Sequence, residues 1–302
     1  DVLNKYREKK LSPVDVISAL IKRIETVNPK INAFNYFDFD KSLELAKESE
    51  RKFYGNQDVL PLEGIPLAIK DEVNIKGQPN RNGCLLLKNN IAQKTDVDIE
   101  RIVNSGAILH GRTTNPEFSL TSFCHSKLNG VTRNPWHLDM TSGGSSGGSA
   151  AALASGCAML ATGSDIGGSI RIPAGACGVV GFKPPHGRNA QSYPFNHDPY
   201  CVTGPLARTV VDTALMQNVM CGPNQKDITS LRPRKILPLT LSAQVGVSTD
   251  IILLHDVSNL AGKDLIKIND EIIKIDLVAI GATNSLNVIR GAMGTVAAAH
   301  TV

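Results

Sequence analysis

Apolar residues in the first part of the chain recur with the period of an α-helix. Residues 12–27 carry them every three or four positions, and Ser12-Pro13 is a favourable helix start because serine caps a helix and proline fits its first turn. Asn28-Pro29 is expected to end this helix. A second segment with the same pattern covers residues 40–54 and is closed by Gly55. The pattern predicts two helices before the first buried strand.

Short apolar runs alternate with helical segments through the middle of the chain. Residues 64–69 form such a run, and residues 106–111 form another directly after a helical segment at residues 96–105. A helix followed by a buried strand is typical of a parallel α/β layer. Residues 178–184 predict one more short strand, and a further helix begins near Val210. We therefore predict an α/β fold for this part of the chain.

The C-terminal part of the chain has a different pattern. Apolar and polar residues alternate in strand fashion over residues 265–275, with Asn269-Asp270 at the expected hairpin turn, and a second pair of strands flanks residues 281–284. Residues 239–302 carry four basic and six acidic side chains, a net charge of −2, whereas the rest of the chain carries +6. This shift favours a separate β-rich module.

The change of pattern predicts a division of the chain into domains. We expect an α/β domain over residues 1–228, a linker over residues 229–244 that is rich in arginine and proline at its start, and the β-rich module over residues 245–302.

Composition excludes several classes of function. The 302 residues are 42% hydrophobic and 20% charged with a net charge of +4, which favours neither nucleic acid nor an anionic membrane as a partner. No apolar run has the length of a membrane span, and the N-terminal residues do not resemble a signal peptide. We expect a cytoplasmic globular protein, and the sequence leaves a homo-oligomer open.

The cysteines and histidines predict neither a metal site nor a disulfide framework. The six cysteines are widely spaced without a Cys-x-x-Cys pair, and the seven histidines form no His-Glu-x-x-His pattern. Buried free thiols are therefore expected. We predict no metal and no cofactor.

Two stretches in which serine stands among glycines carry the candidate chemistry. They are Gly143–Ser149 and Ser164–Pro173. Glycine lets a loop approach a ligand closely and aim several N–H groups at one point. The first stretch leads into the helix-forming residues 149–156, which disfavours a flexible linker, and it lacks the Gly-Lys-[Ser/Thr] ending of a phosphate loop.

The first stretch also matches Gly-x-Ser-x-Gly, the pattern of a nucleophile elbow. An elbow requires a strand directly before it. Residues 137–142 are short, mixed and polar, so we expect no strand there and regard the match as accidental.

Together with an upstream lysine, the two stretches resemble the amidase signature family. The family's lysine strand stands here as Gly64–Asp71, its Gly-Gly-Ser-Ser-Gly-Gly loop as Gly143–Gly148 and its second serine block as Gly163–Pro173. Members use a Ser-cisSer-Lys triad on α/β/α layers around a mixed sheet. The resemblance implies the following roles: Ser169 as nucleophile, Ser145 as bridging serine and Lys70 as base.

The chemistry requires these residue types. A serine hydroxyl is a poor nucleophile until a base takes its proton, and a lysine is such a base only when neutral. Burial at the end of an apolar strand disfavours the ammonium form of Lys70. Ser145 would relay the proton, with Ser146 in support, and Asp165 and Arg171 would brace the second loop. The expected oxyanion hole consists of the backbone N–H groups of Ile166, Gly167, Gly168 and Ser169.

Two hypotheses of different class remain. The first is a hydrolase of linear carboxylic amides that forms an acyl-enzyme, with a small-molecule amide as partner; within the family, a glutamine amidotransferase subunit for tRNA-dependent amidation is the alternative, although such subunits commonly have glutamine where Ile172 stands. The second hypothesis is a non-catalytic, truncated or virion-associated structural protein. Family members usually continue for a further half-domain beyond about Asp227, which makes the domain here incomplete at its C-terminus.

Residues 288–300 resemble a small β module of bacteriophage virion proteins. This resemblance motivates the virion-associated hypothesis, in which part of an amidase is joined to a piece of a virion protein. Two further explanations of this tail are a β extension of an unusual amidase and a join that arose in gene prediction or assembly.

Overall fold

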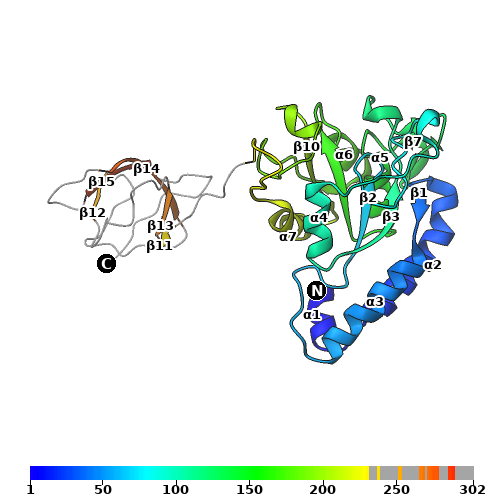
Figure 1. The fold of residues 1–302 in the computed structure, drawn as a ribbon, viewed down its shortest axis with the longest axis horizontal. Coiled ribbons are helices and arrows are strands. Elements are labelled where there is room, and N and C mark those ends of the chain that lie inside the picture. Colours follow the sequence, from blue (N-terminus) through cyan, green and yellow to red (C-terminus); the bar gives the residue numbers. More distant parts are fainter. Residues whose placement is uncertain (231–236, 239–250, 254–264, 269–270, 279–284, 290–302) are drawn as a thin grey trace. The chain divides into compact units, whose positions relative to one another are not determined.

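The structure is a computed structural model that describes residues 1–230 and five strands beyond them. It divides the chain into two compact units, Asp1–Leu231 and Arg232–Val302. Most of the predicted linker, residues 229–244, lies outside the described residues. Figure 1 draws the residues that are not described as a thin grey trace.

The first unit contains a six-stranded mixed sheet. The strand order is β1-β3-β2-β8-β10-β9 (Figure 1). The central strand β2 runs parallel to both of its neighbours, and the other pairs are antiparallel. The strands are β1 (Phe34–Phe37), β2 (Pro66–Lys70), β3 (Ile108–Thr113), β8 (Leu160–Asp165), β9 (Val180–Gly181) and β10 (Val202–Ala207). The predicted α/β fold around a mixed sheet is confirmed.

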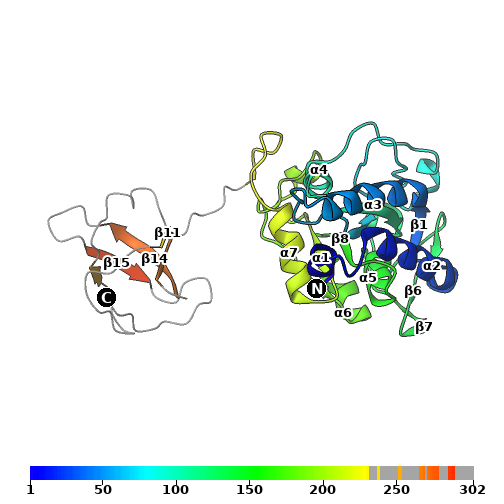
Figure 2. The ribbon, with the colours of Figure 1, turned by 90° about the horizontal axis from the view of Figure 1, so that it is seen from below.

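Helices cover both faces of this sheet. Figure 2 shows α5 and α6 on one side and α3 with α4 on the other. The helices are α1 (Val2–Arg7), α2 (Pro13–Ile31), α3 (Phe39–Tyr54), α4 (Val97–Asn104), α5 (Gly147–Ala154), α6 (Arg171–Cys177) and α7 (Val210–Met220). Three 3-10 turns (Leu85–Leu87, Glu117–Ser119, Phe195–His197) and two short ribbons, β4 (His125–Ser126) with β5 (Gly130–Val131) and β6 (Arg133–Asn134) with β7 (His137–Thr141), complete the unit.

Alternation along β2 distributes its side chains between two apolar cores. Leu67 and Ile69 pack with residues of α4 and α7, whereas Ala68 packs with α2, α5 and α6. Lys70 follows the same alternation and therefore projects toward the α5 face of the sheet. The α5 side of this core consists largely of alanines, so the helix lies close to the strands.

Helix α2 passes the residue that was expected to end it. It runs from Pro13 to Ile31 with Pro29 inside its last turn, so the predicted end at Asn28-Pro29 is wrong. The helix instead ends where Asn32 adopts the left-handed conformation with φ of 51°. The Asn28 side chain accepts hydrogen bonds from the N–H groups of Ala33 and Phe34, which ties the chain after the helix back to its last turn.

The second unit contains a five-stranded sheet. Its order is β11-β13-β14-β15-β12, and β13 pairs with β14 in antiparallel fashion on either side of Asn269-Asp270, as the alternating pattern predicts. The strands are β11 (Leu237–Pro238), β12 (Ile251–Leu253), β13 (Leu265–Ile268), β14 (Glu271–Val278) and β15 (Ser285–Ile289). Most of residues 288–300, which carry the resemblance to a virion module, lie outside the described residues.

All six cysteines lie in the first unit as free thiols, five of them buried. None of the helices in the described part of the chain combines the length and the apolar composition that crossing a bilayer requires.

Asp98 in α4 makes the stability of the first unit depend on pH. Burial, with a smaller contribution from the charge of Asp96, raises the pKa of Asp98 to about 7. The folded state therefore binds a proton that the unfolded state releases near pH 4. This contribution to stability is complete below pH 4, decreases as the pH rises and is lost above about pH 7.

We expect Asp98→Asn to be more stable than the wild type at pH 8, by up to about 4 kcal/mol, because the asparagine has no charge to bury. The difference should shrink toward pH 4. Thermal melts of both proteins at pH 4, 6 and 8 measure this effect. A difference in melting temperature that stays constant across these pH values would contradict the assignment.

Candidate active site

Lys70 lies at the end of β2 with its ammonium group in the interior. The side chain is 1% exposed, and its backbone N–H donates to Thr162 Oγ1 at 3.0 Å. Strands β2 and β8 are parallel neighbours, so their carboxyl ends meet at the same edge of the sheet. This edge brings Lys70 next to Ser164 near the end of β8.

Three polar side chains surround the Lys70 ammonium group. Lys70 Nζ donates to Ser145 Oγ at 2.7 Å and to Ser164 Oγ at 2.8 Å, and it lies 3.0 Å from Glu72 Oε2. All of these side chains are buried. The predicted base and the predicted bridging serine, which are 75 positions apart in the sequence, are thus in direct contact.

The loop that carries Ser145 is held very close to its surroundings. Its Gly144-Ser145 peptide bond is cis. A Cβ at Gly144 would lie 2.7 Å from the backbone of Phe123, and one at Gly148 would lie 2.5 Å from the backbone of Thr114. Only glycine allows this approach, which places the start of α5 against the edge of the sheet.

Ser146 joins the two serine loops. Its backbone N–H donates to the carbonyl oxygen of Ser169 at 3.1 Å, and its hydroxyl accepts from the backbone N–H of Ser164 at 3.4 Å. The loop of the bridging serine is therefore bonded to the backbone of the predicted nucleophile.

A strand does precede the first serine loop, contrary to expectation. Residues His137–Thr141 form β7, which pairs only with the short strand β6. Every residue of β7 is exposed, which explains its polar sequence. Because β7 is not part of the main sheet, the loop differs from a nucleophile elbow, which follows a strand of the central sheet.

Asp165 organises the second serine loop. Its buried carboxylate accepts hydrogen bonds from three backbone N–H groups, of Gly168, Ile170 and Arg171, and from the Arg171 guanidinium. Burial by itself would raise the pKa of Asp165, but the bonds from Arg171, Ile170 and Gly168 outweigh it and lower the pKa below its usual range. Asp165 and Arg171 thus hold the shape of the loop.

The same contacts narrow the set of oxyanion donors. The N–H of Gly168 points to Asp165 Oδ1 at 2.8 Å and is not free for an oxyanion. Within residues 1–230, the N–H groups of Ile166, Gly167 and Ser169 donate to no protein acceptor. Ile166 and Gly167 are exposed and Ser169 is half-buried, so substrate has access to this side of the loop.

Two residues that contact Lys70 were not predicted from the sequence. Glu72 and Ser164 both contact Lys70 Nζ, although neither was assigned a role there. Glu72 lies in the turn after β2, where its backbone N–H donates to the Lys70 carbonyl oxygen at 2.9 Å, so the strand pattern gave no signal for the glutamate. Ser164 offered no signal either, because its contact depends on the pairing of β2 with β8.

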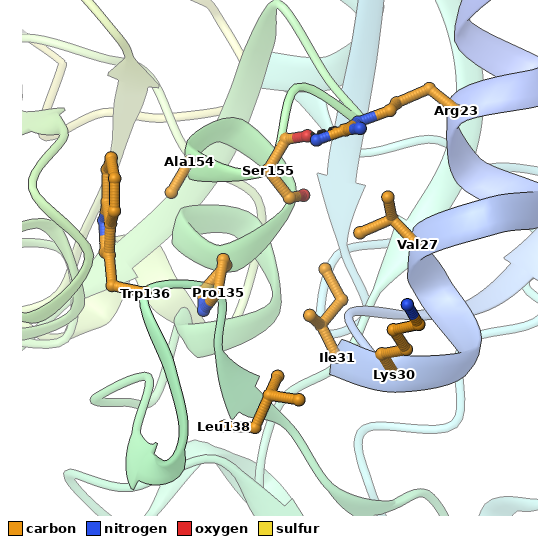
Figure 3. Close-up of a pocket in the computed structure, with 9 residues that line it drawn as sticks. All are labelled: Arg23, Val27, Lys30, Ile31, Pro135, Trp136, Leu138, Ala154 and Ser155. Carbon is orange, nitrogen blue, oxygen red and sulfur yellow. Dashed lines mark hydrogen bonds between the residues drawn. The ribbon is translucent and has the colours of Figure 1, made fainter.

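A cavity of about 320 Å³ lies elsewhere, between α2, the end of α5 and the ribbon that carries Trp136 (Figure 3). Arg23 crosses from α2 to donate to the Ser155 carbonyl oxygen at 2.8 Å. None of the predicted triad residues lines this cavity. In the described residues, no group of three or more histidine, cysteine, aspartate or glutamate side chains is placed to hold a metal ion.

Comparison with known proteins agrees with this geometry. The chain matches the Amidase family over residues 15–252. It is 41% identical over 227 residues to a Glutamyl-tRNA(Gln) amidotransferase subunit of Methylacidiphilum infernorum, an alignment that covers 74% of this chain and 44% of that protein. It is 39% identical over 225 residues to an acylamidase of Rhodococcus erythropolis, covering 73% of this chain and 46% of the relative.

Solved structures show the same fold. A bacterial aryl acylamidase of the amidase signature family superposes with a TM-score of 0.73 at 34% identity, covering 79% of this chain and 53% of the other. A peptide amidase from Stenotrophomonas maltophilia superposes with a TM-score of 0.71 at 28% identity, covering 78% of this chain and 50% of the other. The chain spans about half the length of the relatives that it matches. Because the family match, the fold and the sequence identities agree, the chain belongs to the Amidase family.

Proposed function

We propose that the chain hydrolyses linear carboxylic amides through an acyl-enzyme on Ser169. The observation that carries the proposal is the contact of 2.7 Å between Lys70 Nζ and Ser145 Oγ in a buried site. Ser146 bonds the loop of Ser145 to the Ser169 backbone, which supports the assignment of Lys70, Ser145 and Ser169 to one site. An acyl-enzyme on serine requires a base that activates the hydroxyl.

The reaction has two halves. Ser145 takes the proton of the Ser169 hydroxyl and passes its own proton to Lys70, while Ser169 Oγ attacks the amide carbon. The free N–H groups of Ile166, Gly167 and Ser169 stabilise the oxyanion of the tetrahedral intermediate. The carbon–nitrogen bond then breaks, the leaving amine takes back a proton along the same path, and water releases the acid from Ser169 by the reverse sequence.

The surface around Ser169 is suited to a small amide. Ile166 is 56% exposed and Ile172 is 41% exposed, and both flank the half-buried nucleophile with apolar surface. Arg171 pairs with the Asp165 carboxylate through Nε and Nη2, which offsets its charge. We therefore propose small, uncharged acyl groups as substrates.

Treatment with a fluorophosphonate, followed by intact-mass analysis and peptide mapping, tests the proposal. We expect one adduct at Ser169 and turnover of simple aryl and alkyl amides. A cooperative thermal melt without an adduct would favour the non-catalytic hypothesis and contradict the proposal.

The amidotransferase role is a second candidate, because one relative, a Glutamyl-tRNA(Gln) amidotransferase subunit, is 41% identical to this chain over 227 residues. Its test is whether ammonia release from glutamine needs partner subunits and charged tRNA. Turnover of simple amides by the chain alone, with no effect of tRNA, would exclude this role. Ile172 stands where these subunits commonly have glutamine, which favours the hydrolase.

A further inference from the structure

We propose that Glu72 receives the proton that Lys70 releases when Lys70 accepts one from Ser145, so that lysine and glutamate act as a single base. The inference rests on the proposed hydrolysis and adds to it a residue that acts through Lys70 and not on the substrate. Its basis is the arrangement of hydrogen-bonding groups around Lys70 Nζ.

We take Lys70 as an ammonium group paired with Glu72, in place of the neutral amine expected from the sequence, and an ammonium base needs a second acceptor. An ammonium group has three N–H donors and no lone pair, and Lys70 Nζ has three partners, namely Ser145, Ser164 and Glu72. To take the proton of Ser145, Lys70 must release one of its own. Of the three partners, only the carboxylate of Glu72 accepts a proton without forming a cation.

Glu72 is fixed in place by contacts of one carboxylate oxygen, and its other oxygen is available to accept a proton. Its side chain is buried, and Oε2 lies 3.0 Å from Lys70 Nζ while it accepts a hydrogen bond from Ser119 Oγ at 2.5 Å. Within the described residues, its other oxygen, Oε1, is buried without a hydrogen-bond partner. A carboxylate that served only as a counter-ion would normally have both oxygens bonded.

The chain adopts an unfavourable backbone conformation to place Ser119 on Glu72. Phe118 and Ser119 have φ values of 50° and 57°, in the left-handed region that side chains other than glycine, asparagine and aspartate seldom adopt. Asn115 Nδ2 donates to Ser119 Oγ at 3.0 Å, which directs the serine proton to the carboxylate. This support orients Oε2 toward Lys70.

The proton transfer balances. An O–H bond of Ser145 breaks and an N–H bond of Lys70 forms, while another N–H bond of Lys70 breaks and an O–H bond forms on Glu72 Oε2. Lys70 remains an ammonium group throughout, Glu72 becomes a carboxylic acid, and the negative charge moves to the oxyanion of the intermediate. When the intermediate collapses, the same protons return and one leaves with the amine.

Few other groups near the pair change charge between pH 5 and 10. Burial raises the pKa of the Cys124 thiol above its usual range and that of the Cys201 thiol to about 12. Arg112 remains a cation, and Asp71 Oδ1 lies 3.6 Å from its guanidinium. Burial raises the pKa of Asp71, but this residue is the same in every variant compared below.

The test is the rate of fluorophosphonate labelling of the full chain between pH 5 and 10. The pH profile of the wild type is the reference for the variants. Glu72→Gln retains the hydrogen bond but accepts no proton, so Lys70 must first lose its proton to water. We expect the acidic midpoint to rise by about two pH units or more, with labelling at pH 7 about 100-fold slower and largely recovered at pH 10.

Two further variants complete the test. Glu72→Asp keeps a proton acceptor, so its acidic midpoint should stay at the wild-type value even if labelling is slower. Glu117→Gln removes an exposed carboxylate close to Ser119 and should behave as the wild type. If Glu72→Gln lacks a cooperative melt, Glu72→Asp decides: an unchanged midpoint supports the inference, and a raised one overturns it.

Several outcomes would overturn the inference. A midpoint that is unchanged or lower in Glu72→Gln would show that Glu72 only pairs with the ammonium group, and an equal loss of rate at every pH would show a merely structural role. If the wild type is labelled, these results refute only the role of Glu72 and leave the proposed function standing. An unlabelled wild type refutes the proposed function and the inference together.

Discussion

Replacing Ser169 by alanine is expected to abolish amide hydrolysis, with a loss of about 10⁴-fold or more, while the folded structure remains intact. The substitution removes the atom that forms the acyl-enzyme, and no other group of the site can take its place. The Ser169 side chain is half-buried, so its loss should change the free energy of unfolding by no more than about 0.5 kcal/mol.

The measurement combines the rate of amide turnover, fluorophosphonate labelling by intact mass and a thermal melt. Ser18→Ala is a matched control, because Ser18 is a half-buried serine on α2, outside both serine loops. Turnover that survives in Ser169→Ala would show that another residue is the nucleophile. An adduct that persists in this variant would lead to the same conclusion.

Replacing Lys70 by methionine is expected to remove labelling and also to destabilise the first unit. Methionine fills the space of the lysine stem but has no group that takes the Ser145 proton. It also leaves the buried carboxylate of Glu72 without its cation, since the two side chains are 1% and 2% exposed. Removing one partner of a buried ion pair costs about 3–5 kcal/mol, which corresponds to a drop of roughly 10 °C in melting temperature.

The double variant Lys70→Met with Glu72→Gln separates the two effects. It removes the uncompensated charge, so most of the lost melting temperature should return while labelling stays absent. Lys88→Met serves as the control for removing a lysine at an exposed position. Stability that is unchanged in Lys70→Met, or labelling that returns in the double variant, would contradict the buried ion pair or the role of Lys70 as base.

Much of this protein was readable from local sequence patterns. The helix spacing and the short apolar runs predicted an α/β fold, and the resemblance of the lysine strand and the two serine loops to the amidase signature family implied a serine-lysine site. The structure brings Lys70 and Ser145 into contact and joins the loop of Ser145 to Ser169. These features depend on periodicity, on backbone freedom at glycine and on residue chemistry, all of which a short stretch of sequence expresses.

Local patterns gave the wrong result at the end of α2 and at β7. Pro29 was expected to end α2, but the helix continues to Ile31, and Asn28 accepts hydrogen bonds from the backbone just after it. The mixed sequence of β7 conceals a strand because both of its faces are exposed. The exposure of β7 comes from the packing of the chain and not from the segment's own composition.

From the sequence by itself, the resemblance to the amidase signature family predicts Lys70 as base, Ser145 as bridging serine and Ser169 as nucleophile. Only the tertiary structure decided what surrounds the base: Ser164 reaches Lys70 through the pairing of β2 with β8, and Ser119 reaches Glu72 across 47 positions. Hydrogen-bond partners in a buried site are selected by which chain segments pack together, and a local sequence pattern does not contain that information.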